Sequence, residues 1–122
     1  MGSLQPELPS RRMTDMRIGI VSQGISLTQA ISDYAQRRLK TALNRYEPLL
    51  ASVQVRVADV NGPRGGIDKH CVVEVRGPTL ASIIVRERDV DLYVAIDRAA
   101  DRIDRATARR ISRARDLARG FR

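Results

Sequence analysis

The chain has 122 residues, which suits one domain and is enough to bury a core without a metal or a disulfide. Its formal net charge is +8, and all but two of its 22 basic residues are arginine, so nucleic acid or an anionic membrane surface is the expected kind of partner. The single cysteine excludes an internal disulfide and suits a reducing cytoplasm, and no apolar run is long enough to span a membrane.

Residues 1–15 hold two prolines and lack periodic apolar positions. They are interpreted as a flexible tail or an expression remnant, with Met13 or Met16 as possible natural starts. We expect one folded domain over residues 16–119.

The first predicted elements are a strand and a helix. Residues 16–22 alternate apolar and other side chains, which predicts a strand. Residues 26–46 carry apolar side chains at helical spacing, with an N-cap at Thr28 or Ser26, and Pro48 is expected to end this helix.

Three further strands are predicted from alternation. Residues 52–60 form the first of these, and Gly77 and Pro78 mark a turn between the other two. The positions expected to face the core in the last two strands are Cys71, Val73, Val75, Ala81, Ile83 and Val85.

The predicted order is β-α-β-β-β-α. About thirty residues with a helix separate the first two strands, which allows a parallel crossover, whereas the short later links favour antiparallel pairs. Alternating strands indicate a sheet with one covered face. The expected fold is therefore α+β in two layers, with a four-stranded sheet and two helices packed on one face.

Residues 91–119 predict one long amphipathic helix. Its expected apolar face is Leu92, Ile96, Ala99, Ile103, Thr107, Ile111 and Ala114. A second stripe, within roughly 80° of arc, consists of Arg98, Arg102, Arg105, Arg109 and Arg113.

The arginine stripe has two interpretations. A charged stripe is usually a solvated helix face. Here residues 105–115 contain five arginines and no acid, and such a run repels itself unless a polyanion binds it. The sequence therefore favours contact with nucleic acid.

The strand order, together with DLYVAIDRAADRIDR at residues 91–105, resembles the ribosome hibernation-promoting factor and ribosome-associated inhibitor family. The resemblance covers about residues 16–117 and includes TQAISDYAQRRL at residues 28–39. The loop NGPRGGIDK at residues 61–69 resembles a subset of members with a longer, glycine-rich hairpin.

The resemblance implies a translation inhibitor that binds the RNA of the small ribosomal subunit in the decoding channel under stress. From the residues themselves we expect no cofactor, no metal and no small-molecule substrate. The family's long form has a C-terminal domain that pairs ribosomes, and this chain, which ends at Arg122, is expected to be a short form. The positions that match the family's basic helix faces are Arg98, Arg102, Arg105, Arg109, Arg110, Arg113, Arg37, Arg38 and Lys40.

The loop before the third strand has two open interpretations. Its glycines fit a wide hairpin that needs positive φ angles. Alternatively, Arg64 and Lys69 add an RNA contact.

Other chemistry has little support. His70 and Cys71 are neighbours on a strand and would point to opposite faces, so we expect no catalysis there. The acids Asp97, Asp101 and Asp104 are expected to pair with arginines and not to bind a metal ion. The tyrosines Tyr34, Tyr46 and Tyr93 are expected to pack in the core, so recognition would depend on phosphates.

Two other functions stay open. One is a general binder of double-stranded RNA or DNA, and the other is a regulatory module that binds a protein through its charged helix. An enzyme is not expected.

Overall fold

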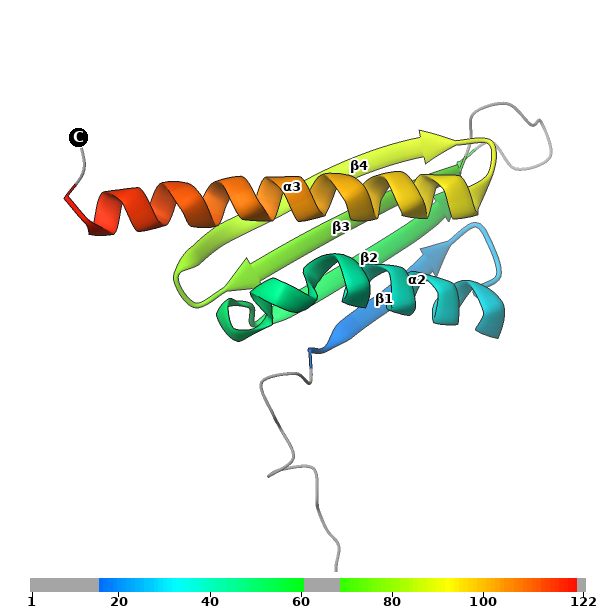
Figure 1. The fold of residues 1–122 in the computed structure, drawn as a ribbon. Helices are drawn as coiled ribbons and strands as arrows, with labels where there is room; N and C mark the ends of the chain where they lie inside the picture. The colour runs from blue at the N-terminus through cyan, green and yellow to red at the C-terminus, as the bar shows by residue number, and fades with distance from the viewer. Residues whose placement is uncertain (1–15, 61–68, 121–122) are drawn as a thin grey trace, which may run out of the picture.

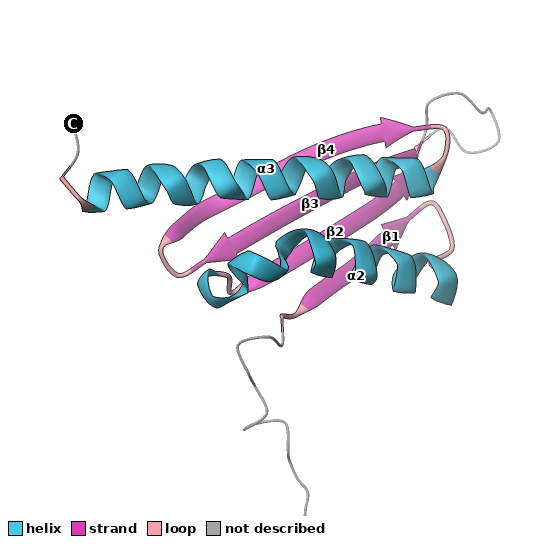
Figure 2. Cartoon of the chain, in the orientation of Figure 1, coloured by secondary structure: helices cyan, strands magenta, loops and turns pink. Residues whose placement is uncertain are grey.

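A computed structural model describes residues 16–60 and 69–120 of the protein. Two helices lie side by side on one face of a sheet, and no helix of the described residues covers the opposite face (Figure 1). Figure 2 shows the same two layers by element type. The elements are β1 (Ile18–Gln23), α2 (Gln29–Leu43), the 3₁₀ helix η1 (Asn44–Leu49), β2 (Ser52–Asp59), β3 (Lys69–Gly77), β4 (Leu80–Asp89) and α3 (Leu92–Ala118).

The sheet confirms the predicted topology. Its four strands lie in the order β1-β2-β3-β4, with β1 parallel to β2 and the other two pairs antiparallel. The segment between β1 and β2 contains α2, as a parallel connection requires. The predicted α+β class and the helix-covered face are therefore confirmed.

The core lies between the sheet and the helices, because each strand buries alternate side chains. In β2, Val53, Val55 and Val57 are almost fully buried, and Gln54 and Arg56 between them point away from the helices. Ile96 and Ile103 of α3 have no exposed surface and pack into this layer. Burial of such side chains contributes roughly 1.5–3 kcal/mol each.

Helix α2 begins after Thr28, whose side chain accepts a hydrogen bond of 3.2 Å from the Ile31 amide. Thr28 is thus the N-cap, and the alternative at Ser26 is wrong. The predicted end is also wrong, because the α-helix stops at Leu43 and the chain continues as η1, which contains Pro48. The tighter 3₁₀ turn ends the helix before the proline is reached.

Helix α3 begins where the sequence predicts. The carboxylate of Asp91 caps it by accepting a hydrogen bond of 2.9 Å from the Tyr93 amide. Its predicted apolar face is buried as far as Ile111, but Ala114 is exposed. The reason is that the last turns of α3 extend beyond the sheet (Figure 1).

Two local features adjust the sheet edges. Ala81 is exposed, contrary to prediction, because it lies beside the β3–β4 turn, where the strand register shifts between Val75 and Gly77. After β1 the chain turns at Gly24, whose φ is +71°. A Cβ there would lie 2.7 Å from the Asp59 carbonyl oxygen, so the position requires glycine.

Candidate nucleic-acid interface

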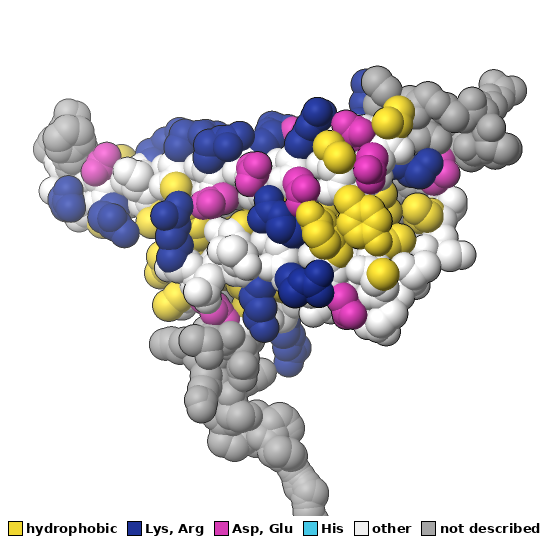
Figure 3. All heavy atoms as spheres, turned by 45° about the vertical axis from the view of Figure 1, so that its right-hand side comes forward, with side chains coloured by type: hydrophobic (Ala, Val, Ile, Leu, Met, Phe, Trp, Pro, Cys, Tyr) yellow, Lys and Arg dark blue, Asp and Glu magenta, His cyan; other side chains and the backbone are white. Residues whose placement is uncertain are grey.

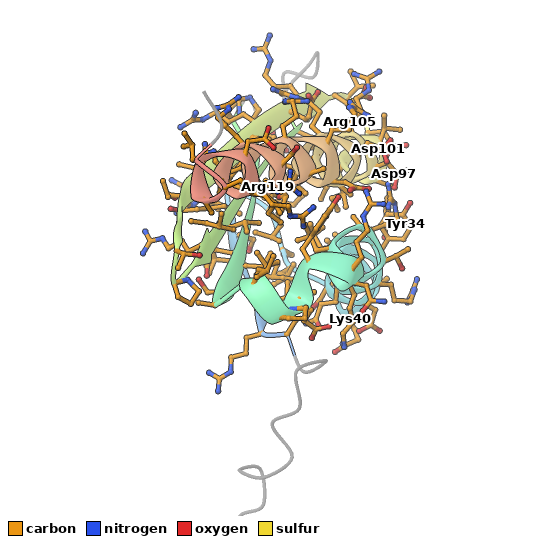
Figure 4. The ribbon with its side chains drawn as sticks, turned by 60° about the vertical axis from the view of Figure 1, so that its left-hand side comes forward. Tyr34, Lys40, Asp97, Asp101, Arg105 and Arg119 are labelled. Carbon is orange, nitrogen blue, oxygen red and sulfur yellow. The ribbon has the colours of Figure 1, made fainter. Side chains whose placement is uncertain are left out.

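The arginine stripe of α3 lies on the side of the helix that faces away from α2. Figure 3 shows basic side chains gathered along the upper edge of the molecule, over α3, with acidic side chains in a band beneath them. Arg105 points to this outer edge in Figure 4, whereas Asp97 and Asp101 lie toward α2. The helix therefore separates its positive and negative charges onto two flanks.

Three of the predicted arginines bond to β4. Arg102 Nη1 lies 2.8 Å from Glu87 Oε2 and donates a second hydrogen bond of 2.9 Å to the Arg86 carbonyl oxygen. Arg98 Nη1 lies 3.5 Å from Asp89 Oδ2. Arg110 donates a hydrogen bond of 3.2 Å to the Ala81 carbonyl oxygen. These side chains fasten α3 to the edge of the sheet.

The other three arginines of the outer edge form what we name the α3 column: Arg105, Arg109 and Arg113. Within the described residues, none of them has an ion pair or a side-chain hydrogen bond. Their spacing of four residues sets them about 6 Å apart along the helix axis. Their charge is therefore available to a polyanion.

The predicted basic residues of α2 divide between two sides of that helix. Arg38 lies between the helices and is only 27% exposed. Arg37 and Lys40 instead border a shallow depression of about 400 Å³ with Thr41 and Asn44. Figure 4 shows Lys40 on the flank of α2 that is turned away from α3. Arg37 and Lys40 are thus separated from the α3 column by the junction of the two helices.

The junction of α2 and α3 is polar along the first half of α3. Asp97 accepts hydrogen bonds from the Tyr34 hydroxyl at 2.5 Å and from Arg38 Nε at 2.9 Å. Arg38 also reaches Asp101 Oδ1 at 3.1 Å. Burial alone would raise the pKa of Asp97, but the Tyr34 hydroxyl and the Arg38 guanidinium outweigh it and hold that pKa below its ordinary value. The carboxylate therefore stays ionised and ties α3 to α2.

The second half of the junction repeats the pattern. Asp104 Oδ1 accepts hydrogen bonds from the Tyr46 hydroxyl at 2.7 Å and from Arg45 at 2.9 Å. Burial, followed by the hydrogen bond to Asp104, raises the pKa of Tyr46 above its ordinary value. Asp97, Asp101 and Asp104 thus pair with α2 and η1, in agreement with the expectation that they pair with arginines.

The tyrosines only partly fit the predicted core role. Tyr46 is 8% exposed and belongs to the core. Tyr34 is partly buried and packs against the core, and its ring meets that of Tyr93 edge to face with ring centroids 4.9 Å apart, whereas Tyr93 is 37% exposed. The expectation that Tyr93 is buried is wrong, because Tyr93 is in the first turn of α3, where its ring meets that of Tyr34 edge to face and stays open to solvent.

The loop candidates are only partly described. Arg64 and residues 61–68 lie outside the described residues. Lys69 begins β3, and its Nζ lies 3.3 Å from Asp59 Oδ2 at the end of β2. Lys69 is therefore bound to the neighbouring strand.

Sequence reasoning overlooked a second group of arginines on the strands. Arg56, Arg86 and Arg88 occupy outward positions and are exposed. The signal was available, because each of them alternates with the buried positions of its strand.

The remaining candidates for chemistry lie apart. Cys71 is fully buried, and burial, with a smaller effect of Glu87, raises the pKa of its thiol to about 12. His70 points to the opposite face, as predicted. Among the described residues, no three potential metal ligands of the His, Cys, Asp or Glu type lie together. Neither described helix has the length and apolar content that a membrane span needs.

Comparisons with known proteins agree with this geometry. Residues 18–115 match the model of the sigma 54 modulation protein / S30EA ribosomal protein family. The N-terminal domain of Protein Y from Thermus thermophilus is similar in structure, with a TM-score of 0.61 and 28% identity over 77% of this chain and 98% of that one.

A ribosomal subunit interface protein from Coxiella burnetii has the same fold. Its TM-score is 0.65 at 14% identity, over 77% of this chain and 96% of that one. No curated protein sequence matches the chain.

Proposed function

The chain belongs to the sigma 54 modulation protein / S30EA ribosomal protein family, and from this premise we propose that it binds the RNA of the small ribosomal subunit and inhibits translation reversibly. The structural relative from Coxiella burnetii is described as a ribosomal subunit interface protein. An RNA in the decoding channel, where messenger and transfer RNA bind, is the proposed target. Such a protein would act in the cytoplasm, under stress.

The observation that carries this proposal is the α3 column. Arg105, Arg109 and Arg113 have no acidic partner among the described residues, although Arg98 and Arg102 of the same stripe do. Guanidinium groups bind phosphates with two parallel hydrogen bonds, and an exposed row of them follows a nucleic-acid backbone. The column is therefore the proposed centre of the RNA contact.

The other candidates take secondary roles in this proposal. Arg98, Arg102 and Arg110 hold α3 against β4 and are near enough to the column to add electrostatic attraction. Arg38 supports the junction of the helices. Arg37 and Lys40 would reach RNA on the far flank of α2, and Lys69 would do so only at the end of the sheet where β3 begins. Arg64, outside the described residues, is proposed to add a further contact.

We expect the α3 column to determine both the affinity for small ribosomal subunits and the dependence of that affinity on salt. Changing Arg105, Arg109 and Arg113 together to glutamine should weaken binding to small subunits. Each neutralised phosphate contributes roughly −0.7 to −0.9 to the slope of log affinity against log salt, so the slope should become less steep by about 2 to 3. Filter binding of labelled protein at several salt concentrations measures it.

The matched control changes Arg45, Arg115 and Arg119 to glutamine. This variant loses the same formal charge from exposed arginines outside the column. Because Arg45 and Arg119 also lose their ion pairs with Asp104 and Asp116, circular dichroism verifies its fold. It should bind nearly as the unchanged protein does. Equal losses in both variants would contradict the assignment, because bulk charge would then explain the binding.

A further inference from the structure

The sheet face that carries no helix is itself strongly basic. Alternation in β2, β3 and β4 turns the residues between the buried positions toward solvent. Arg17, just before β1, is exposed as well. The arginines of this face are Arg17, Arg56, Arg76, Arg86 and Arg88, and its one acid within the described residues is Glu74.

The single acid neutralises only part of this charge. Glu74 accepts a hydrogen bond from the Ser82 hydroxyl, and its Oε2 lies 3.1 Å from Arg76 Nη2. The Ser82 hydroxyl, then Arg76, lower the pKa of Glu74, so it stays ionised and offsets Arg76. The other four arginines have no ion pair within the described residues.

The strand register sets two of these arginines at a fixed spacing. Arg56 of β2 lies opposite Val72 of β3, and Val72 lies opposite Arg86 of β4. Two strand spacings separate the arginines, which is about 10 Å between their backbones. Between them is a small hollow of about 60 Å³, lined by Gln54, Arg56, Val72, Glu74, Ile84 and Arg86.

The composition of the uncovered sheet face indicates which class of partner fits it. Its larger apolar side chains are Val21, Val72 and Ile84, and the described tyrosines all lie in helical segments. Protein interfaces rely on aromatic and apolar anchors, and RNA binders that stack bases display aromatic rings. Nucleic-acid interfaces are more polar and much more positive. The face therefore fits an RNA backbone.

We propose that the uncovered sheet face is a second RNA-binding surface, in which Arg56, Arg86 and Arg88 bind phosphates. Because the α3 column belongs to the helix layer and these arginines to the opposite face, one molecule would hold two RNA segments, one on each side (Figure 1). The inference shares its RNA partner with the proposed function but concerns a different set of residues.

The test uses 20-base-pair RNA duplexes of mixed sequence, labelled with either a donor or an acceptor fluorophore, with the protein limiting. Three variants are compared with the unchanged protein. The sheet variant carries R56Q, R86Q and R88Q; the column variant carries R105Q, R109Q and R113Q; and the control carries R45Q, R115Q and R119Q. Circular dichroism verifies the fold of each.

The unchanged protein and the control should bring donor and acceptor duplexes together and give energy transfer. The sheet and column variants should each still bind one duplex, with a salt slope less steep by about 2 to 3, and give no energy transfer. Energy transfer by the sheet variant at the unchanged level would overturn the inference, as would an equal loss in the control.

Two further outcomes separate this inference from the proposed function. If the sheet variant loses RNA binding and the column variant does not, the second surface stands and the α3 column is the wrong site. The same variants are also tested for binding to polyglutamate, a model of an acidic protein. If the sheet variant binds RNA normally but loses affinity for polyglutamate, the face binds an acidic protein and the inference fails.

Discussion

Thr107 shows how a single polar atom is held in the core. Its side chain has no exposed surface, and its hydroxyl oxygen has no hydrogen-bond partner among residues 16–60 and 69–120. Burial of an unpaired hydroxyl costs about 1–3 kcal/mol. The sequence placed Thr107 on the apolar face, and its burial confirms this, but the sequence does not reveal whether the hydroxyl finds a partner.

We therefore expect Thr107→Val to stabilise the fold. Valine has nearly the same shape and removes the unpaired hydroxyl, so the free energy of unfolding should rise by about 1 kcal/mol. Urea denaturation followed by circular dichroism measures it. Thr107→Ser, which keeps the hydroxyl and loses the methyl group, is the control and should be less stable than the unchanged protein. A loss of stability in the valine variant would mean that the hydroxyl is bonded.

The junction of α2 and α3 depends most on Asp97 among the acids of the long helix. Asp97 accepts hydrogen bonds from both Tyr34 and Arg38, whereas Asp101 is 64% exposed and pairs with Arg38 alone. Asp97→Asn should lower the free energy of unfolding by about 1 kcal/mol. Asp101→Asn should lower it by less than half as much. Equal effects in urea denaturation would contradict the central role of Asp97.

The stability that this junction contributes should fall at both low and high pH. The pKa of Asp97 is lowered in the folded protein, so its contribution is present above its unfolded pKa, about 3.9, and is lost as the pH falls through the folded value. The hydrogen bond to Asp97, with burial, raises the pKa of Tyr34, so that contribution is present below about pH 10 and is lost as the pH rises through the folded value.

The difference in stability between the unchanged protein and Asp97→Asn should therefore be largest between about pH 5 and pH 9 and shrink at both ends. Thermal melts across the range measure it. A difference that is constant with pH would contradict this account.

The helices and strands themselves could be predicted from the sequence. The alternation or helical spacing of apolar residues reflects only which side chains of one segment are buried. The DLYVAID segment illustrates this: Asp91 caps α3, Leu92 and Ile96 are buried, and Asp97 binds α2. Pairing across 59 residues of chain, as between Arg38 and Asp97, could not be predicted, because it depends on how the two helices pack. That packing decides which arginines are available to a ligand.

At the scale of the whole molecule, where the net charge is +8, the fold separates arginines that pair with acids from arginines that do not. Acids gather between the helices and along β4, where they bind Arg38, Arg45, Arg98 and Arg102. Most of the arginines without an ion pair in the described residues lie on the outer edge of α3 and on the open sheet, and the others are Arg37 on α2 and Arg115 beside η1. Family membership, together with this division, supports a ribosomal RNA as the partner.

The central claim is that the protein binds the small ribosomal subunit in preference to RNA in general. Co-sedimentation with separated small and large subunits, at near-physiological salt and with excess competitor duplex RNA, tests it most directly. We expect one protein bound per small subunit, resistant to the competitor, and none on the large subunit. Equal binding to both subunits, or complete loss to the competitor, would contradict the claim and leave a general binder of duplex RNA.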